Sequence, residues 1–583
     1  MEGESGESGL KIIKFNLYLI IKFKLVTMKH FLLIIFFLNL NIPLFSQCSH
    51  PDYEGLMELY HSTGGENWTN NSGWKEGAAG TDCDPCKWFG VKCETDGRVI
   101  ELLLKENNLI GIIPNLKLLF LKKLDLKTNK LFGEIPNFEY IPNLISLNVG
   151  VNELFGKIPD FTNLLKLDYL GCYTNKLTGE IPDFQNLPKL NEFQCHENML
   201  FGSIPNFGKL LNIEYLTISN NQLTGSIPDF SNSPKLKFII CGYNQLTGKI
   251  PNFNYIPNLE WFECNDNNLI GDIPDFSKTK NLVAIKCSYN QISGTIPDLS
   301  YFARLFAFDV DNNQLTGKIP YLKNLPKLAS FSCNNNQLTG EIPDLETPKL
   351  SWFECQNNNL TGPIPDFTNL AKLSTFKCYN NNLTGILPSF ENVPLLYYFE
   401  CYENNIYGQL PSFTQNPKLT YLRCYSNNFS GCFPDNICNI PFVLSNGNPR
   451  LPFQGDPTQF CAGDSQIGAP CDDGNTETQN DIIKEDCTCG GSILNKNENK
   501  KDQVVINITP NPFSDLLSIS ISQFPPKPLT IFIYNLNGEA VLNKKCEDAE
   551  DIILDLKDFA SGVYIVKVYF DNNLSIFRKV VKL

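Results

Sequence analysis

Hydrophobic and polar positions alternate in a fixed pattern over most of this chain. A glycine followed by any residue, then by Ile, Leu or Phe, and then by Pro recurs fifteen times from Gly111 to Gly431, at intervals of 23 residues except for two of 22. Before each glycine, Leu or Phe alternates with a second apolar residue, often Cys, and this period of two predicts a short strand. A fixed period of this length predicts a solenoid in which each unit adds one turn.

Two other positions of the unit carry a structural expectation. An asparagine stands four residues before each of these glycines, from Asn107 to Asn427. Because a buried amide must be hydrogen-bonded to offset its desolvation, we expect it to bind main-chain groups of adjacent turns. The proline three residues after each glycine should end the strand and start the return path. A Phe or Leu two residues further on, such as Phe138 and Phe161, should form a second buried stack.

The pattern changes after a polar linker at residues 492–504. Runs such as LTIFIYNLNGEAVL and SGVYIVKVYF alternate β-branched and polar residues and are separated by turn residues. Several short strands of this kind predict a small β-sandwich over residues 505–583.

Composition and charge narrow the function classes. The net charge of −14 argues against a nucleic-acid partner, since phosphate binding needs clustered Lys and Arg. The 21 cysteines would be unusual in a reducing compartment unless most are buried or bind metal.

The N-terminal residues predict export. From Met28 the chain reads as a secretory signal peptide: Lys29 and His30, an apolar run, and cleavage between Ser46 and Gln47. We therefore expect a signal peptide within residues 1–47, with the true start at Met28. The alternative is an uncleaved membrane anchor, for which the apolar run is short. No other segment could cross a bilayer.

Residues 52–114 carry a family resemblance. They contain Trp68, GW at residues 73–74, CDPCKWFGVKC at residues 83–93 and GRVIELLLKENNLIGIIP at residues 97–114. This stretch and the repeats to residue 434 resemble plant-type extracellular leucine-rich repeats, which include polygalacturonase-inhibitor-like proteins and receptor-kinase ectodomains. The period is slightly shorter than in plants, so bacterial relatives are the closer match. The resemblance implies the disulfides Cys48–Cys83 and Cys86–Cys93 in an N-terminal cap.

The expected fold class follows from the repeats and this resemblance. It is an α/β-type leucine-rich-repeat solenoid with parallel strands on the concave face, a mostly irregular convex side and disulfide caps, followed by a small all-β sandwich. The expected domains are a signal peptide (1–47), an N-terminal cap (48–98), about 15 repeats (99–434), a cysteine-rich C-cap (435–491), a linker (492–504) and a sorting domain (505–583).

Ten cysteines occupy one column of the repeat, where other units have Leu, Val or Ile. They are Cys172, Cys195, Cys241, Cys264, Cys287, Cys333, Cys355, Cys378, Cys401 and Cys424. A column that exchanges Cys with aliphatic residues is a buried apolar column, so we expect reduced thiols. The alternative, a ladder of metal ligands, needs converging side chains that a repeat column does not supply.

Six further cysteines follow the last repeat and predict a disulfide-held cap, whose connectivity the sequence leaves open. They are Cys432, Cys438, Cys461, Cys471, Cys487 and Cys489. The stretch around Cys471 resembles a cysteine-rich module common in exported Bacteroidota proteins. Its acidic residues Asp472, Asp473 and Asp481, with Asn475, are a weak calcium candidate. Turn formation by Asx residues is the favoured reading.

The last eighty residues resemble a second family. Pro510-Asn511-Pro512-Phe513, Asn535 with Gly538, Ser561-Gly562-Val563-Tyr564 and Lys579-Val580-Val581-Lys582 are similar to the type IX secretion C-terminal sorting domain of Bacteroidota. This implies delivery by the type IX secretion machinery to the cell surface or the medium. The alternative is an ordinary adhesive β-sandwich.

Catalysis receives little support from the sequence. The four histidines stand in no nucleophile or metal motif, and His196 is expected to face solvent from a strand. Aspartates that follow proline, such as Asp183 and Asp275, recur with the repeat and are expected to cap turns. We therefore expect no enzyme activity, no cofactor and no structural metal.

Aromatic residues at outward-facing strand positions favour a binding function. Soluble surfaces seldom carry so many large rings without a partner. We expect the concave face to bind an extracellular protein, peptide or glycan; the alternative is a passive structural component of the cell surface. The candidate contacts near the end of the repeats are Trp352, Tyr379, Tyr397, Tyr398, Tyr402, Tyr421 and Tyr425. A competing site is formed by Tyr215, Phe238 and Trp261.

Overall fold

The computed structural model describes residues 48–74, 83–493, 505–511, 513–522, 529–535, 538–546, 551–570 and 575–583. The predicted signal peptide and residues 494–504 of the predicted linker lie outside this range. The chain forms two compact units, one up to Leu360 with residues 369–373, the other comprising residues 361–368 and 374–583. No helix among the described residues is long and apolar enough to cross a membrane.

The first unit begins with a small cap. Its elements are α2 (Tyr53–Ser62), η1 (Gly65–Asn67), η3 (Pro85–Lys87) and β1 (Val91–Cys93). Trp68, Trp74 and Trp88 are buried against one another, with ring centres 4.9 and 5.0 Å apart. The bonds Cys48–Cys83 and Cys86–Cys93, which are the pairs that the resemblance implied, hold the cap. Strand β1 pairs antiparallel with the first repeat strand and so covers the open end of the sheet.

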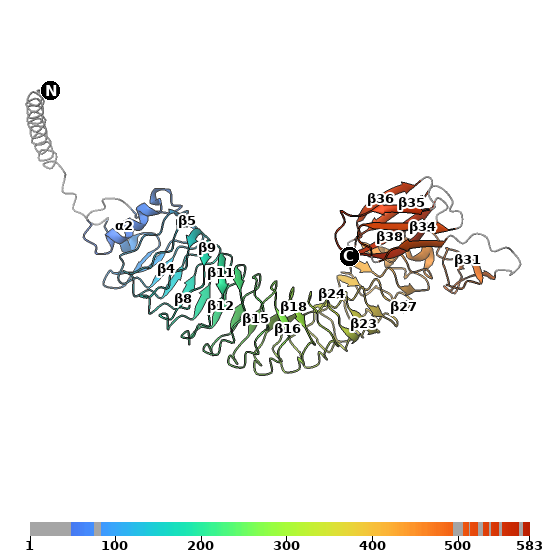
Figure 1. The fold of residues 1–583 in the computed structure, drawn as a ribbon, viewed down its shortest axis with the longest axis horizontal. Helices are drawn as coiled ribbons and strands as arrows, with labels where there is room; N and C mark the ends of the chain where they lie inside the picture. The colour runs from blue at the N-terminus through green and yellow to red at the C-terminus, as the bar shows by residue number, and fades with distance from the viewer. Residues whose placement is uncertain are drawn as a thin grey trace, which may run out of the picture. The chain divides into compact units, whose positions relative to one another are not determined.

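The repeats of the first unit contribute one parallel strand each to a continuous sheet (Figure 1). These strands are β2 (Val99–Leu103), β4 (Lys123–Asp125), β6 (Ser146–Asn148), β8 (Tyr169–Gly171), β10 (Glu192–Gln194), β12 (Tyr215–Thr217), β14 (Phe238–Ile240), β15 (Trp261–Glu263), β17 (Ala284–Lys286), β19 (Ala307–Asp309), β20 (Ser330–Ser332) and β22 (Trp352–Glu354). Equivalent residues of consecutive turns are paired, as Phe238 with Trp261. We call the outward side of these strands the strand face; it is the face predicted to be concave.

A second series of short strands was not predicted. It comprises β3 (Ile110–Gly111), β5 (Lys130–Gly133), β7 (Glu153–Gly156), β9 (Lys176–Gly179), β11 (Met199–Ser203), β13 (Gln222–Thr224), β16 (Ile270–Asp272), β18 (Gln291–Ser293), β21 (Thr339–Glu341), β23 (Asn359–Gly362), β25 (Asn382–Leu383), β27 (Tyr407–Gly408) and β29 (Asn428–Phe429). Strands β3 to β13 of this series form a parallel sheet of six strands. From Gly133 on, the repeat glycines at or beside these strands have φ between +74° and +93°, a conformation that glycine adopts without strain.

The repeated asparagine makes the hydrogen bonds predicted for it. Asn267 is buried, and its Nδ2 donates to the carbonyl oxygens of Cys241 in the preceding turn and of Cys264 in its own turn, at 3.2 and 3.1 Å. Its Oδ1 accepts from the main-chain N–H of Leu246 at 2.9 Å. The same bonds recur at Asn175 and Asn290. Each asparagine therefore joins its turn to the preceding one.

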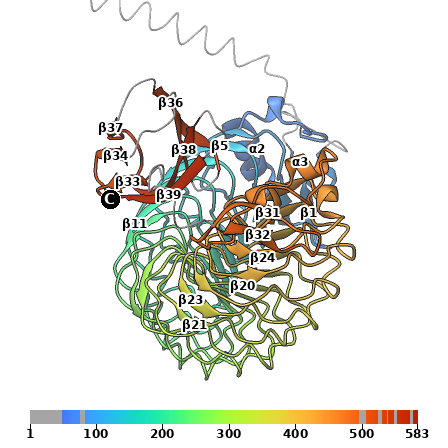
Figure 2. The same ribbon diagram turned by 90° about the vertical axis from the view of Figure 1, so that its right-hand side faces the viewer.

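The core consists of stacked columns of equivalent residues. The central apolar residues of the main strands, such as Leu124 and Phe262, the ten repeat cysteines and the phenylalanines after the Pro are buried. Phe138 and Phe161 stack with ring centres 6.4 Å apart, which confirms the second buried stack predicted from the sequence. Figure 2 looks along the repeats of the first unit and shows successive turns as stacked loops. None of the ten repeat cysteines forms a disulfide in the structure.

The second unit continues the repeat with the strands β24 (Thr375–Lys377), β26 (Tyr398–Glu400), β28 (Tyr421–Arg423) and β30 (Phe442–Leu444), which pair in parallel. The C-cap then contains η4 (Ile437–Asn439), η5 (Pro452–Gly455), α3 (Thr458–Cys461), β31 (Thr478–Ile483) and β32 (Cys489–Ile493). Its six cysteines form three bonds, Cys432–Cys487, Cys438–Cys461 and Cys471–Cys489.

The C-terminal domain is a sandwich of two antiparallel sheets. One has the strands β33 (Val505–Thr509), β34 (Leu516–Ser522) and β37 (Asp551–Asp555); the other has β35 (Leu529–Tyr534), β36 (Ala540–Cys546), β38 (Gly562–Phe570) and β39 (Ser575–Lys582). Ile519 and Leu554 of the first sheet share one core with Ile531 and Val566 of the second. The all-β sandwich predicted from the alternating pattern is thus confirmed.

Candidate binding surface

Three aromatic rings form a stack along the strand face of the second unit. Tyr398, Tyr421 and Phe442 open strands β26, β28 and β30 and are register partners. Their ring centres are 4.5 and 4.7 Å apart, with nearly parallel planes. Tyr397 lies edge-on to Tyr398 and to Tyr421, at 4.7 and 5.8 Å. We call these four residues the outer ladder.

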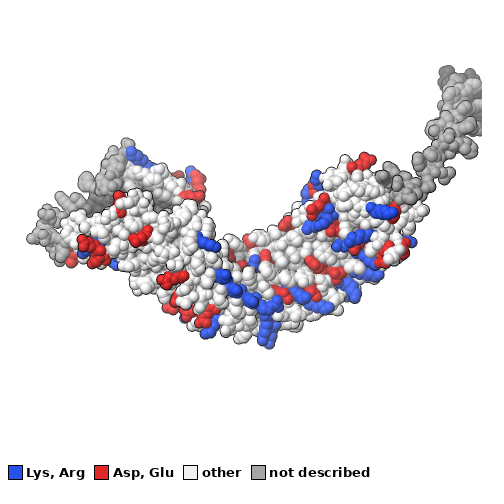
Figure 3. Space-filling view, turned by 180° about the vertical axis from the view of Figure 1, so that it is seen from behind, with Lys and Arg blue, Asp and Glu red and all other residues white. Residues whose placement is uncertain are grey.

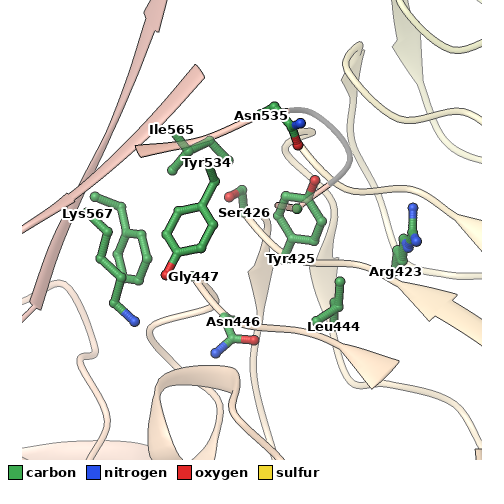
Figure 4. A pocket seen from close by; sticks show the side chains of 12 residues that line it. Arg423, Tyr425, Ser426, Leu444, Asn446, Gly447, Tyr534, Asn535, Ile565 and Lys567 are labelled. Atoms are coloured by element: carbon green, nitrogen blue, oxygen red, sulfur yellow. The ribbon is translucent and has the colours of Figure 1, made fainter. Parts of the chain in front are cut away.

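A second stack follows the buried cysteines of the same turns. Tyr379, Tyr402 and Tyr425 come directly after Cys378, Cys401 and Cys424, and their ring centres are 4.2 and 4.3 Å apart. We call these three tyrosines the inner ladder. Figure 4 shows the side chain of Tyr425 together with those of Arg423 and Leu444 from the last turns of the repeats.

Charged side chains occupy the column that lies between the two ladders in the strand register. Lys377, Glu400 and Arg423 are successive register partners at the ends of β24, β26 and β28. Arg423 Nη1 lies 3.4 Å from Glu400 Oε1, and Lys377 Nζ lies 5.7 Å from the centre of the Tyr398 ring. Because Glu400 is buried, this ion pair is better shielded from solvent than a surface pair.

The two ladders differ in accessibility. The ring of Tyr402 has neighbours on both faces and is only 3% exposed, and burial raises the pKa of Tyr402 and of Tyr425. Tyr397 and Phe442 are exposed, Phe442 by 54%. The inner ladder therefore supports the surface, whereas the outer ladder offers contact area. Phe442 was missed because it follows the last repeat glycine, although its register pairing with Tyr421 places it in the ladder.

The other sequence-predicted aromatics belong to the first unit. Tyr215, Phe238 and Trp261 are register partners on β12, β14 and β15, with ring centres 5.0 and 6.5 Å apart. Lys286 Nζ lies 5.2 Å from the Trp261 ring centre. Trp352 is 41% exposed and opens β22, in a different part of the strand face from these three.

The residues weighed for catalysis have structural roles. His196 follows strand β10, is half-buried rather than fully solvent-facing, and stacks on Tyr173 at 4.6 Å; burial lowers the pKa of His196. Asp183 and Asp275 accept hydrogen bonds from the main-chain N–H two residues on, at 3.3 and 2.8 Å. The prediction that these aspartates cap turns is confirmed.

The acidic residues of the C-cap do lie together. Oxygens of Asp472, Asp473 and Asp481 are all within 4.8 Å of one another. Asp472 accepts from Gly474 N at 2.8 Å and Asp473 from Asn475 N at 2.7 Å, and the latter bond lowers the pKa of Asp473. These are the Asx turns that the sequence favoured, and calcium binding stays a prediction.

Surface charge is mixed in sign. On the face shown in Figure 3, Lys and Arg are interspersed with Asp and Glu rather than gathered into one basic patch. This distribution agrees with the net charge of −14 and gives a nucleic acid no broad basic surface on that face.

Two family models match parts of the chain. Residues 507–583 match the secretion system C-terminal sorting domain, and residues 212–233 and 418–440 match the leucine-rich repeat. A search of the curated proteins finds no match for the chain.

Three solved structures, two of them of receptors, are similar to this chain. A TDR receptor is 27% identical, with 60% of this chain and 68% of that chain covered and a TM-score of 0.55. The ectodomain of the receptor kinase GASSHO1/SCHENGEN3 from Arabidopsis thaliana is 25% identical over 68% of this chain and 57% of that chain, with a TM-score of 0.47. A leucine-rich-repeat protein from Leptospira interrogans is 26% identical over 54% of this chain and 82% of that chain, with a TM-score of 0.45.

Proposed function

We propose that this leucine-rich-repeat protein, which a type IX sorting domain directs to the cell surface or the medium, binds an extracellular protein, peptide or glycan through its strand face. The observation that carries the proposal is the outer ladder, a row of stacked and accessible rings on consecutive turns. We therefore propose Tyr397, Tyr398, Tyr421 and Phe442 as the main contact site.

The physical basis is preorganisation. Rings stacked at 4.5 and 4.7 Å are already fixed, so a partner that covers them orders few side chains on this protein and loses little entropy on binding. The column of Lys377, Glu400 and Arg423 sets charges of both signs beside the rings, which favours one orientation of the partner. Aromatic and Arg side chains are also the types that dominate binding energy at interfaces.

The similarity to a solved receptor supports a binding role. The structure with the TM-score of 0.55 is named a receptor, and leucine-rich-repeat folds of this kind typically bind ligands rather than catalyse reactions. The sorting domain also places the repeats where extracellular partners are encountered.

The test is an array of extracellular proteins, peptides and glycans, probed with the mature chain. We expect discrete partners, whose affinity falls at least tenfold in a variant with Tyr397, Tyr398 and Tyr421 replaced by Ser. The fold should survive, because these rings project from the sheet. The matched control replaces Tyr140, Tyr255 and Tyr301, which are exposed in the return segments, and should bind like the wild type.

Two results would contradict the proposal. If replacement of Tyr215, Phe238 and Trp261 abolishes binding while the outer-ladder variant binds normally, the site lies in the first unit. If the array finds no partner, the protein is a structural component of the surface without a specific ligand.

A further inference from the structure

A hollow of about 310 Å³ lies on the strand face of the first unit, away from both ladders. Its floor is polar and consists of Asn265, Asp266, Lys286, Ser288, Asp309, Asp311, Ser330 and Ser332. It is bordered by Tyr243, Tyr289 and Trp352. These residues come from six consecutive turns, and the sequence pattern did not bring them together.

Small residues interrupt a column of large ones beside the hollow. Trp261, Ala284, Ala307, Ser330 and Trp352 are direct register partners on consecutive strands. The two tryptophans are thus four strand spacings apart, or about 19 Å, with only small side chains between them. Asp309, in the next column, is half-buried and borders the hollow.

The polar groups of the floor are held in place by one another. Ser330 Oγ donates to Asp309 Oδ1 at 3.1 Å, and Ser288 Oγ donates to Asp311 Oδ1 at 2.5 Å. Asn312 Nδ2 donates to Asp311 Oδ2 at 2.7 Å. Of the two carboxylate oxygens of Asp309, only Oδ1 accepts a hydrogen bond from the described residues, and burial raises the pKa of Asp309. The carboxylates of Asp309 and Asp311 are therefore hydrogen-bond acceptors held in fixed positions, and Asp309 is partly shielded from water.

The borders are flat and accessible. Tyr289 is 55% exposed and Trp352 is 41% exposed, and Tyr243 is exposed as well. An aromatic face packs well against an apolar surface, and the C–H faces of a pyranose ring are such a surface. The hydroxyls at the edge of the same sugar ring need fixed acceptors and donors, which the floor supplies.

We infer that this hollow is a binding site for a neutral oligosaccharide. Tyr289 and Trp352 stack on sugar rings, and Asp309 and Asp311 accept hydrogen bonds from hydroxyls. Acidic glycans are disfavoured, because the carboxylates outnumber the single ammonium of Lys286 in the floor. Lys286 offsets the charge of Asp309, whereas Asp266 and Asp311 make a cationic peptide the competing ligand, which the test below includes. This site is separate from the one proposed at the outer ladder.

The tryptophans give the test a direct signal. Three of the five tryptophans, Trp68, Trp74 and Trp88, are buried in the N-terminal cap, so a change in Trp emission on adding sugar reports on Trp261 and Trp352. The probes are cellohexaose, maltohexaose and xylohexaose, with hexalysine as the cationic peptide, titrated into the full mature chain by fluorescence and calorimetry. We expect at least one oligosaccharide to bind and change the emission.

Two variants locate the site. Trp352→Ala removes one border, and Asp309→Asn keeps the side-chain shape and the bond from Ser330 but removes the charge. Both should weaken sugar binding at least tenfold, while the control Tyr321→Ala, an exposed ring in a return segment, should leave it unchanged. Replacement of Tyr397, Tyr398 and Tyr421 should also leave sugar binding unchanged, which separates this site from the outer ladder.

The inference is overturned if none of the three oligosaccharides binds, or if either hollow variant binds sugar like the wild type. It is also overturned if hexalysine binds and Asp309→Asn removes that binding, since the hollow would then be a cation site.

Discussion

The repeat cysteines illustrate how burial controls chemistry at single residues. Burial raises the pKa of Cys424 to about 12, and it raises the pKa of Cys264 and Cys401 as well. The thiolate is the reactive form, so at pH 8 a group with this pKa is reactive in a fraction on the order of 10⁻⁴. Equivalent strand positions stack about 4.8 Å apart with parallel Cβ directions, a geometry that does not suit a disulfide.

We therefore predict a simple thiol titration. A thiol reagent at pH 8 should label only Cys546 in the native protein, because it is the one free cysteine of the described residues that is not buried. Denaturation without reductant should expose ten more thiols. The Cys546→Ala variant should show no native labelling. Native labelling of several cysteines, or disulfides between repeat cysteines, would show that the column is open or oxidised.

The residue level was only partly predictable from the sequence. The burial of the cysteine and phenylalanine columns could be predicted, because a core position recurs once in every repeat and accepts only apolar side chains. The burial of Tyr402 could not, since it depends on its stacking against Tyr379 and Tyr425. Asp309 and Asp311 each resemble a turn residue in the sequence, and only the strand register brings them to one hollow.

At the level of the element, the repeated asparagines, which we call the asparagine ladder, join consecutive turns through buried hydrogen bonds. Asn267→Ala would remove the donor to the Cys241 and Cys264 carbonyl oxygens and the acceptor for Leu246 N–H. Each buried polar group left unpaired costs about 1–3 kcal/mol, so we expect a loss of at least about 2 kcal/mol. The measurement is urea unfolding followed by circular dichroism.

Two comparisons sharpen this prediction. Asn267→Asp should be more destabilising than Asn267→Ala at pH 7, because a buried carboxylate would face the same carbonyl oxygens. Asn232→Ala, at an exposed position, should change stability by less than about 0.5 kcal/mol. Equal unfolding midpoints for Asn267→Ala and Asn232→Ala would mean that the ladder contributes nothing measurable.

The main strands were predictable, and the second series was not. A strand such as Phe238–Ile240 lies between large apolar residues that set its period of two. The second strands have two to five residues and contain Thr, Gly and polar side chains, as in Lys176–Gly179. Such a segment has the composition of a turn. Its extended form is stabilised by hydrogen bonds to the neighbouring turns, as from Thr339 N of β21 to Gly317 O.

At the scale of the whole molecule, the sorting domain predicts that the protein crosses the outer membrane through the type IX secretion machinery. Deleting residues 505–583 should leave the repeats folded, because the β-sandwich has its own core. The signal for outer-membrane passage would be lost, so the shortened protein should collect in the periplasm. Cell fractionation with protease protection measures this, and the full-length chain is the control. Delivery to the surface without the domain would show that it serves only as an adhesive module.

The organisation of the chain was predictable because repeats, cysteine clusters and the C-terminal strands differ so clearly in composition. The pairing of the C-cap cysteines was not, since six cysteines allow 15 arrangements. Which ring contacts which also depends on the register of strands 23 residues apart, and the sequence alone gives only the average position of each column.

The order of the bonded cysteines has a consequence for biogenesis. In the N-terminal cap the first cysteine pairs with the second and the third with the fourth, whereas no bond of the C-cap except Cys438–Cys461 joins neighbours in the chain. When the polypeptide is exported with its N-terminus first, an oxidase joins cysteines in the order in which they emerge. This order gives native bonds in the N-terminal cap and non-native bonds in the C-cap. Maturation should therefore require an isomerase to reshuffle the C-cap. Without that catalyst, chains should accumulate with a correctly oxidised start and a scrambled end.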